Sequence, residues 1–265
     1  MGGFITRKIF LILLTLTLLN LTGCGGDFDK REKIIIGIDA EFAPLAFKDE
    51  RGELTGFDIE LASEAMKRLG VNAEFKPIIW DNKEAEIISG NIDMIWNGLD
   101  ITDERKEYMI FSKPYMDDRQ IVLVKADSEL DIHSEYDLEG KIVGTQAGST
   151  SDDYINENVE LKNSFKEYKT YERFNETLSA LKSGEIEVIV CDELVARYEM
   201  TICPDKLKII NIKIGEIAET GIGFAKNNTE LRDRVQIVFD EMVKDGTARK
   251  ISLKWFNADL IKNKK

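Results

Sequence analysis

Strand-length apolar runs alternate along this chain with segments that carry the spacing of amphipathic helices. Residues 33–38 form an almost continuous apolar run, which is typical of a strand covered on both faces of a sheet. Residues 57–69 carry an apolar side chain at every fourth position and are followed by Gly70, a typical helix C-cap. Strands that alternate with helices predict parallel βαβ units, and therefore an α/β fold.

The strand–helix alternation occurs in two successive units. The strands that we predict are residues 33–38, 75–80, 92–96, 120–125, 141–145 and 187–191. The helices that we predict are residues 57–69, 84–89, 151–158, 175–182, 193–200, 230–244 and 247–256. Residues 127–140 form a polar connector, and residues 217–225 are expected to cross back as extended chain. We therefore place the boundary between the two α/β units near residues 117–120.

The N-terminus has the features of an export signal. Two basic residues precede the mostly apolar residues 9–21, a segment of signal-peptide length that is too short for a comfortable membrane span. The segment ends in LTGC, which resembles a bacterial lipobox and predicts cleavage before Cys24 and attachment of a lipid to its thiol. The alternative is an ordinary signal peptide with a chance cysteine. We expect a lipoprotein signal peptide at residues 1–23 and a lipid-anchored tether at residues 24–32.

The composition argues against several classes of function. The chain carries a formal net charge of −13, which disfavours nucleic acid as a partner. Its one histidine, His133, lies in a polar segment, and the sequence has neither a CxxC motif nor a cluster of metal-ligating residue types. It also has neither a phosphate-binding loop nor a nucleophile elbow. We therefore expect no metal and no cofactor, and a surface position for His133.

Two cysteines follow Cys24 in the sequence, Cys191 and Cys203. Disulfides persist in exported proteins, so these two residues can form a bridge that closes a short loop. Two buried free thiols are the alternative, and the sequence leaves both open.

The residues that follow the predicted strands are candidates for a binding site, because ligands in open α/β sheets bind outside the carboxyl ends of the strands. Short polar or aromatic stretches stand at each of these positions. The candidate site residues are Asp39, Phe42, Trp80, Asn97, Gly98, Asp100, Arg105, Gln146, Ser149, Thr150 and Asp192.

These residue types suit a free α-amino acid. The planar fork of Arg105 matches a carboxylate, and the backbone around residues 148–150, ahead of a predicted helix, can hold an anion. Asp192 can hold an ammonium group, and Phe42 and Trp80 can form flat apolar walls. Each residue also has an ordinary explanation: a surface ion pair, a helix cap or a place in the core. Together they pair both charges of a zwitterion, which is costly to bury otherwise.

The order and spacing of several motifs also resemble a known family. The motifs are GIDAEFAP at 37–44, GFDIELA at 56–62, ITDER at 101–105, FSKPY at 111–115, DLEGK at 137–141, GSTS at 148–151 and KWF at 254–256. From residue 33 to residue 256 the chain resembles the periplasmic-type solute-binding proteins of polar amino acid ABC transporters, solute-binding protein family 3.

The resemblance implies the two-lobed periplasmic binding protein fold of type II, with two α/β lobes joined by two crossover strands. Lobe 1 is then discontinuous, at residues 33–117 and 221–265, and lobe 2 spans residues 118–220. The ligand is held in the cleft between the lobes.

The resemblance also assigns roles to the candidate residues. Arg105 matches the residue that grips the ligand α-carboxylate, Thr150 the residue whose backbone N–H assists it, and Asp192 the residue that holds the α-ammonium group. Gly98 and Asp100 match positions between them, and the positions that contact or wall in the ligand side chain are Asp39, Phe42 and Trp80.

Two positions depart from the family pattern. Asp100 stands where serine or threonine is usual, and Asn97 stands where small residues are common. Together with Asp39 they make an acidic site, which favours a polar or cationic amino acid such as lysine, arginine, histidine, glutamine or cystine over glutamate or aspartate. The alternative for Asp100 is that it caps the helix that carries Arg105.

The sequence therefore predicts an extracytoplasmic binding lipoprotein that captures a free amino acid and delivers it to an ABC transporter permease. We expect a non-catalytic monomer, anchored to the cell membrane by a lipid on Cys24. The alternatives are a dehydratase-like enzyme on the same scaffold and a ligand sensor for a signalling partner.

Overall fold

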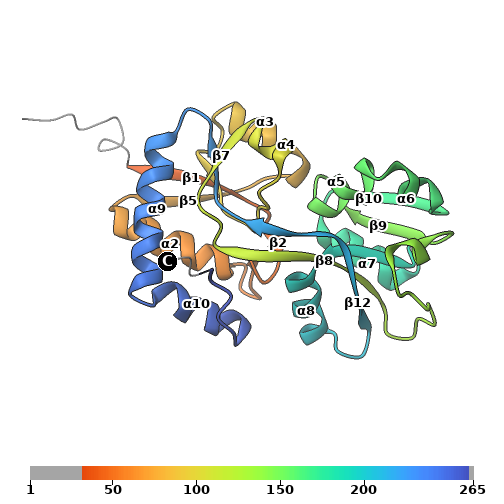
Figure 1. Cartoon of the computed structure of the whole chain (residues 1–265). Helices are drawn as coiled ribbons and strands as arrows, with labels where there is room; N and C mark the ends of the chain where they lie inside the picture. Colours follow the sequence, from red (N-terminus) through yellow and green to blue (C-terminus); the bar gives the residue numbers. More distant parts are fainter. Residues whose placement is uncertain (1–31, 263–265) are drawn as a thin grey trace, which may run out of the picture. The chain divides into compact units, whose positions relative to one another are not determined.

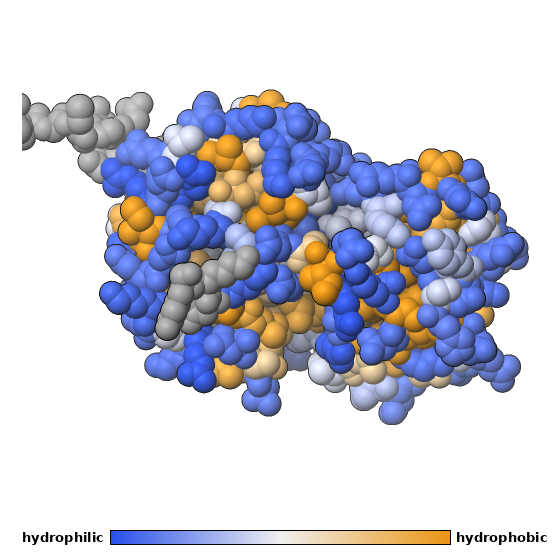
Figure 2. Space-filling model, viewed as in Figure 1, coloured by the Kyte–Doolittle hydropathy of each residue, from blue (hydrophilic) through white to orange (hydrophobic). Residues whose placement is uncertain are grey.

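The computed structural model describes residues 32–262 of the 265-residue chain. The expected signal peptide at residues 1–23 and the lipidation site Cys24 lie outside the described residues, as does almost all of the tether at 24–32. Within the described residues, no helix combines the length and the apolar character that a membrane span requires. Hydrophilic residues cover most of the face seen in Figure 2, and the apolar residues on it are gathered in several patches.

The first of two five-stranded sheets in the described part of the chain has the order β5-β1-β6-β13-β7. Its strands are β1 (Lys33–Ile38), β5 (Asn72–Pro77), β6 (Met94–Ile95), β7 (Met109–Phe111) and β13 (Gly223–Ala225). β1 pairs in parallel with β5 and β6, whereas β13 is antiparallel to both β6 and β7. The carboxyl ends of β1 and β6 therefore meet at one edge of this sheet.

Helices from both ends of the sequence belong to the first lobe. They are α2 (Phe57–Leu69), α3 (Lys83–Ile88), α4 (Asp103–Lys106), α9 (Thr229–Lys244) and α10 (Thr247–Phe256), with the 3-10 helix η2 at Trp80–Asn82. Helices α2, α9 and α10 pack against one another (Figure 1). A small three-stranded sheet, made of β2 (Glu41–Phe42), β3 (Ala46–Lys48) and β4 (Leu54–Thr55), precedes α2 in the chain.

The second five-stranded sheet has the order β10-β9-β11-β8-β12. Its strands are β8 (Met116–Lys125), β9 (Ile142–Gln146), β10 (Glu167–Tyr171), β11 (Val188–Asp192) and β12 (Leu207–Thr220). The helices of this lobe are α5 (Thr150–Glu157), α6 (Val159–Ser164), α7 (Phe174–Ser183) and α8 (Glu193–Ile202), with η3 at Glu135–Leu138.

The apolar runs of the second sheet are continuous because both faces are buried. Along β8, Ile121 and Leu123 belong to one hydrophobic cluster, whereas Val122 and Val124 belong to another. Since side chains alternate between the two faces of a strand, an apolar residue is needed at every position. β11 follows the same pattern.

Two long strands connect the lobes. β8 and β12 run antiparallel side by side, from the pair Met116 and Thr220 at one end to Lys125 and Leu207 at the other (Figure 1). The predicted lobe boundaries at 117/118 and 220/221 fall in β8 and at the end of β12, and they remain predictions.

The α/β class with two sheet-containing lobes is confirmed, and β1, α2 and α10 have the bounds that the sequence predicts. Gly70 is the left-handed C-cap of α2. The strand predicted at 75–80 is wrong at its C-terminal end, because Pro77 ends β5 and Trp80 begins a 3-10 helix. The strand predicted at 92–96 is reduced to the two residues of β6.

We predict that Leu123→Ala lowers the free energy of unfolding by about 2–5 kcal/mol, because truncation of a fully buried leucine leaves a cavity in the second lobe. Urea denaturation followed by circular dichroism measures the change. The control is Ile237→Ala on α9, whose side chain is 60% exposed, and it should change the value by no more than about 0.5 kcal/mol. Equal effects of the two changes would contradict the placement of β8 in the core.

Candidate functional site

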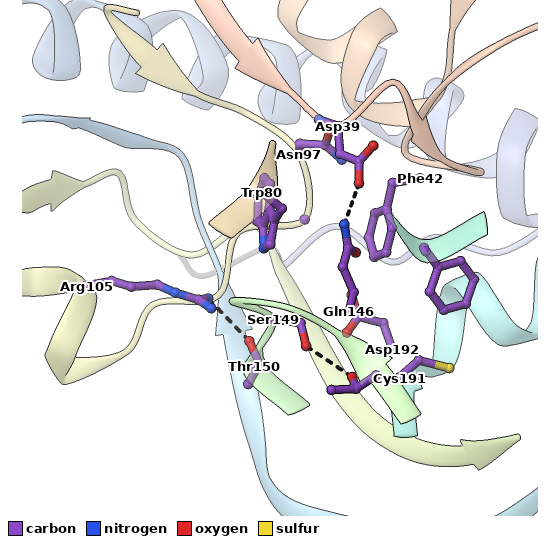
Figure 3. Close-up of a pocket in the computed structure, with 13 residues that line it drawn as sticks. Asp39, Phe42, Trp80, Asn97, Arg105, Gln146, Ser149, Thr150, Cys191 and Asp192 are labelled. Carbon is purple, nitrogen blue, oxygen red and sulfur yellow. Dashed lines mark hydrogen bonds between the residues drawn. The ribbon is translucent and has the colours of Figure 1, made fainter. Parts of the chain in front are cut away.

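A pocket lies where the strand ends of the two sheets come together (Figure 3). Ten of the eleven candidate residues from the sequence line it, and Asp100 does not. The lining residues are Asp39, Phe42, Trp80, Asn97, Gly98, Arg105, Thr145, Gln146, Ser149, Thr150, Phe174, Cys191 and Asp192.

The first lobe positions its part of the pocket through the turns after β1 and β6. The backbone N–H of Asp39 donates to Oδ1 of Asn97 at 2.7 Å, which ties the two strand ends together. Gly98 has φ 56°, a left-handed backbone conformation that favours glycine, and a Cβ there would lie 2.6 Å from Cδ1 of Leu45. Its N–H donates to the buried carboxylate of Asp58 at 2.7 Å.

One end of the pocket is closed by a contact between the lobes. Gln146 Nε2 donates to Asp39 Oδ2 at 2.7 Å, and Figure 3 shows the two side chains directed toward each other beside the ring of Phe42. Burial raises the pKa of Asp39, which is only 3% exposed, although the hydrogen bonds from Gln146 and from the N–H of Glu41 partly offset this effect. The ring of Phe42 also meets Phe174 of the second lobe edge to face, with centroids 5.8 Å apart.

Arg105 lies on α4 and forms the other end of the pocket. Its guanidinium group is 2% exposed and donates to Asp100 O at 3.1 Å and to three groups of the second lobe. These are Gly148 O at 3.3 Å, Thr150 Oγ1 at 3.3 Å and Asp153 Oδ2 at 2.9 Å. Its Nε is buried and has no hydrogen-bond partner among the residues that the structure describes.

Asp100 does not cap the helix that carries Arg105, so that alternative is wrong. The N-cap is Thr102, whose Oγ1 accepts from the N–H of Arg105 at 3.2 Å. The carboxylate of Asp100 is instead 1% exposed and accepts from Thr150 Oγ1 at 2.7 Å and from Thr220 Oγ1 at 3.1 Å. Burial raises the pKa of Asp100, and the charge of Arg105 opposes that shift. Asp100 therefore links the first lobe to α5 of the second lobe and to the crossover strand β12.

Asp192 ends β11 and lines the pocket on the second lobe. Its Oδ1 accepts from Gln120 Nε2 at 2.7 Å, and it makes no capping hydrogen bond to α8. Burial, and then the charge of Asp100, raise the pKa of Asp192 to about 7. A cation bound in the pocket would therefore stabilise the ionised form of Asp192.

Some backbone N–H groups of the loop before α5 and of its first turn donate to nearby side chains of the same segment. Ser149 is the N-cap, and its Oγ accepts from the N–H of Asp152 at 3.1 Å. The N–H of Gly148 donates to the carboxylate of Asp152 at 2.9 Å. The helix-cap alternative thus describes Ser149, while Thr150 directs its hydroxyl toward Asp100 and Arg105.

Several pocket residues were not predicted from the sequence. Thr145 and Cys191 directly precede predicted residues on β9 and β11, so their strand-end positions were an available signal. Phe174 precedes the predicted helix, and no sequence signal marks it.

Lys83 forms a further contact between the lobes. It is 6% exposed and donates to Gly148 O of the second lobe at 2.8 Å. Burial, and then the charge of Arg105, lower the pKa of Lys83 to about 8.

The structure distinguishes between the sequence-based alternatives for Trp80, for the two cysteines and for His133. Trp80 lines the pocket and also packs in a core cluster of the first lobe, so both of its interpretations apply. Cys191 and Cys203 are free thiols, so the disulfide alternative is wrong. The imidazole of His133 is 80% exposed and faces Asp131, in agreement with a surface position.

Comparisons with known proteins agree with this geometry. Residues 34–258 match the family described as bacterial extracellular solute-binding proteins, family 3. The L-cystine-binding protein TcyJ of Escherichia coli K12 is 34% identical over 233 residues, which cover 88% of this chain and 86% of that protein. A solved ABC uptake transporter substrate-binding protein from Streptococcus pneumoniae with bound histidine has a TM-score of 0.84 and 34% identity. That likeness covers 91% of this chain and 100% of the other.

A further solved structure bears on the enzyme alternative. The ancestral amino acid-binding protein AncCDT-1, a precursor of cyclohexadienyl dehydratase, has a TM-score of 0.79 and 33% identity, covering 87% of this chain and 100% of that one. The structural likenesses confirm the periplasmic binding protein fold of type II that the resemblance implies.

We predict that Gln146→Ala lowers the free energy of unfolding by about 1–3 kcal/mol, because the buried carboxylate of Asp39 loses a donor from the opposite lobe. Asn175→Ala is the matched control, since it removes an exposed 3.3 Å hydrogen bond between the lobes, to Glu41. Thermal unfolding at pH 7 compares the variants. A larger loss in the Asn175 variant would contradict the importance of the buried contact.

Proposed function

The chain belongs to the bacterial extracellular solute-binding proteins of family 3, and on that premise we propose that it captures a free amino acid between its lobes for an ABC transporter permease. The observation that carries the proposal is the placement of opposite charges on the two lobes. Arg105 of the first lobe and Asp192 of the second line the same pocket. An α-amino acid offers one carboxylate and one ammonium group for them.

The carboxylate of the ligand is assigned to Arg105. Its Nε is a buried donor without a partner in the described part of the chain, whereas Nη1 and Nη2 donate to Asp100 O, to Gly148 O and Thr150 Oγ1 and to the carboxylate of Asp153. A carboxylate at Nε gains a charge-assisted hydrogen bond in a site from which water is largely excluded. The ammonium group is assigned to Asp192, whose charge is otherwise costly to bury.

A polar or cationic side chain suits the other end of the pocket. The carboxylate of Asp39 and the amide of Asn97 line it, and Nδ2 of Asn97 is a buried donor that has no partner within residues 32–262. Phe42 and Trp80 provide apolar walls. Similar proteins named for the binding of cystine, histidine or arginine support this class of ligand.

Capture works by differential affinity for the closed arrangement. A ligand that bridges Arg105 and Asp192 stabilises the closed form relative to the open one, and the motion takes place at β8 and β12, the two strands that connect the lobes. The permease then recognises the closed form. In this proposal the protein acts as an extracytoplasmic monomer and performs no chemistry on its ligand.

The enzyme alternative needs a group that does chemistry on the bound ligand. Asp100, the residue that departs from the family pattern, accepts hydrogen bonds from Thr150 and Thr220 and is not among the residues that line the pocket. A general acid or base must be within hydrogen-bond reach of its substrate. A ligand sensor would use the same site, and co-purification with a permease or with a signalling partner separates these two roles.

We predict that one or more polar or cationic amino acids raise the melting temperature of the protein, because a ligand that binds only the folded state stabilises it. The measurement is a thermal-shift screen of protein unfolded and refolded to remove bound ligand, against the twenty proteinogenic amino acids, ornithine and L-cystine. Absence of any shift would contradict capture of an amino acid.

The same screen tests the role of Asp192. Asp192→Asn should weaken the affinity for the best ligand by at least about thirtyfold, because removal of one partner of a buried charge pair costs 2 kcal/mol or more. Asp205→Asn, at an exposed position of the same lobe, is the control and should retain the affinity.

We also propose that Cys24 anchors the protein to the cell membrane through a diacylglycerol thioether. Cys24→Ser should move the protein from the membrane fraction to the soluble fraction, because the lipid chains supply the anchoring free energy. Fractionation of cells that express each form, with labelled fatty acid as tracer, measures this. Membrane retention and label incorporation in the serine variant would contradict the lipoprotein assignment.

A further inference from the structure

A glutamine on the crossover strand β8 joins two carboxylates. Gln120 Nε2 donates to Asp118 Oδ2 at 2.5 Å and to Asp192 Oδ1 at 2.7 Å. The orientation of its amide is fixed from the other side, because Ser151 Oγ on α5 donates to Gln120 Oε1. Both hydrogens of one neutral amide are thus used on two acids, only one of which lines the pocket.

No cation neutralises the second acid. Asp118 is 7% exposed, and among residues 32–262 it takes part in no ion pair. Its neighbour Arg119 is turned toward Glu193 and Asn211, at 2.8 Å and 3.2 Å. The opposite strand β12 contributes only uncharged residues in register, Ala218 against Asp118 and Ile214 against Gln120.

The charged and titratable groups around the pair are one carboxylate, one guanidinium group and one thiol. They are Asp100 on the loop before α4, Arg105 on α4 and the thiol of Cys191 on β11. Burial raises the pKa of Asp118 well above its usual range, and the charges of Asp192 and Asp100 add to this shift. Ionisation of both carboxylates, which accept from one amide nitrogen in a buried site, costs free energy.

We propose that Asp118 is a second acid of the ammonium-binding end: Asp118 and Asp192, which accept from the same amide of Gln120, hold one proton between them in the ligand-free protein, and capture of a ligand ammonium group releases that proton to solvent. This inference rests on the proposed function, because Asp192 is the residue assigned to the ammonium group. The positive charge of the ligand replaces the charge of the released proton, so the charge of the site is conserved. Asp118 acts as a positioning residue that makes ligand affinity depend on pH.

The ligand-free protein provides the first test. A carboxyl group whose pKa is raised by folding stabilises the protein fully below its unfolded value, and that contribution is lost as the pH rises through the folded value. The free energy of unfolding of the wild type should therefore fall more steeply from pH 5 to pH 8 than that of Asp118→Asn, in which the amide still accepts from Gln120. Equal slopes would overturn the shared proton.

Controls separate this effect from a general loss of structure. Asp117→Asn changes the adjacent, exposed residue of the same strand, which pairs with Lys262, and should keep the wild-type slope. Asp118→Ser is a second variant in case the asparagine form folds poorly, and it should flatten the slope in the same way.

The ligand provides the second test. Isothermal titration calorimetry at pH 7, in buffers of different ionisation enthalpy, counts the protons released when the amino acid with the largest thermal shift binds. The wild type should release up to about one proton more than Asp118→Asn, a difference that cancels any proton of the ligand itself. Wild-type affinity should rise by up to about tenfold per pH unit between pH 6 and pH 7.

Equal proton counts in the two proteins would overturn the proposal. If no amino acid of the panel binds, the proposed function fails and the coupling to ligand fails with it. The unfolding experiment still decides whether the two carboxylates share a proton, so the two failures are distinguishable.

Discussion

Burial of the Arg105 guanidinium group is the constraint on which the arrangement of the site depends. A buried cation is costly unless acceptors surround it, and the short helix α4 with its own loop supplies only the carbonyl of Asp100. The other acceptors, Gly148 O, Thr150 Oγ1 and Asp153, come from the opposite lobe. The contact between the lobes therefore supplies most of the acceptors that this buried side chain needs.

The sequence predicted the elements whose burial is two-sided or strongly one-sided. The apolar run of β1 and the four-residue stripe of α2 are of this kind, and both were found with correct bounds. β10 was missed because its sequence EYKTY has polar residues at most positions, which its place at the edge of the sheet permits. β6 was shorter than predicted because its bounds depend on which residues its neighbour β1 offers for pairing.

The same distinction applies to the site. Strand ends are visible in a sequence, so the strand-end residues that line the pocket were predicted without the fold. The partner of each side chain was not visible. Asp100 has the charge expected of a ligand-binding residue. Its carboxylate instead accepts hydrogen bonds from Thr150 and Thr220, which lie 50 and 120 residues away in the chain. The sequence identified Gln120 only as the start of a predicted strand. Its hydrogen bonds depend on β8, β11 and α5, which meet only in the folded chain.

The position of β13 has a consequence for how the chain acquires its fold. This short strand lies between β6 and β7 in the first sheet, although both partners precede it by more than a hundred residues. Lobe 2 and its own strand pairs are complete once residue 220 has emerged. A chain that emerges from its N-terminus therefore completes the inserted lobe before the sheet that precedes it in the sequence can close. The lobe that begins first finishes last, and its unpaired edges are exposed in the meantime.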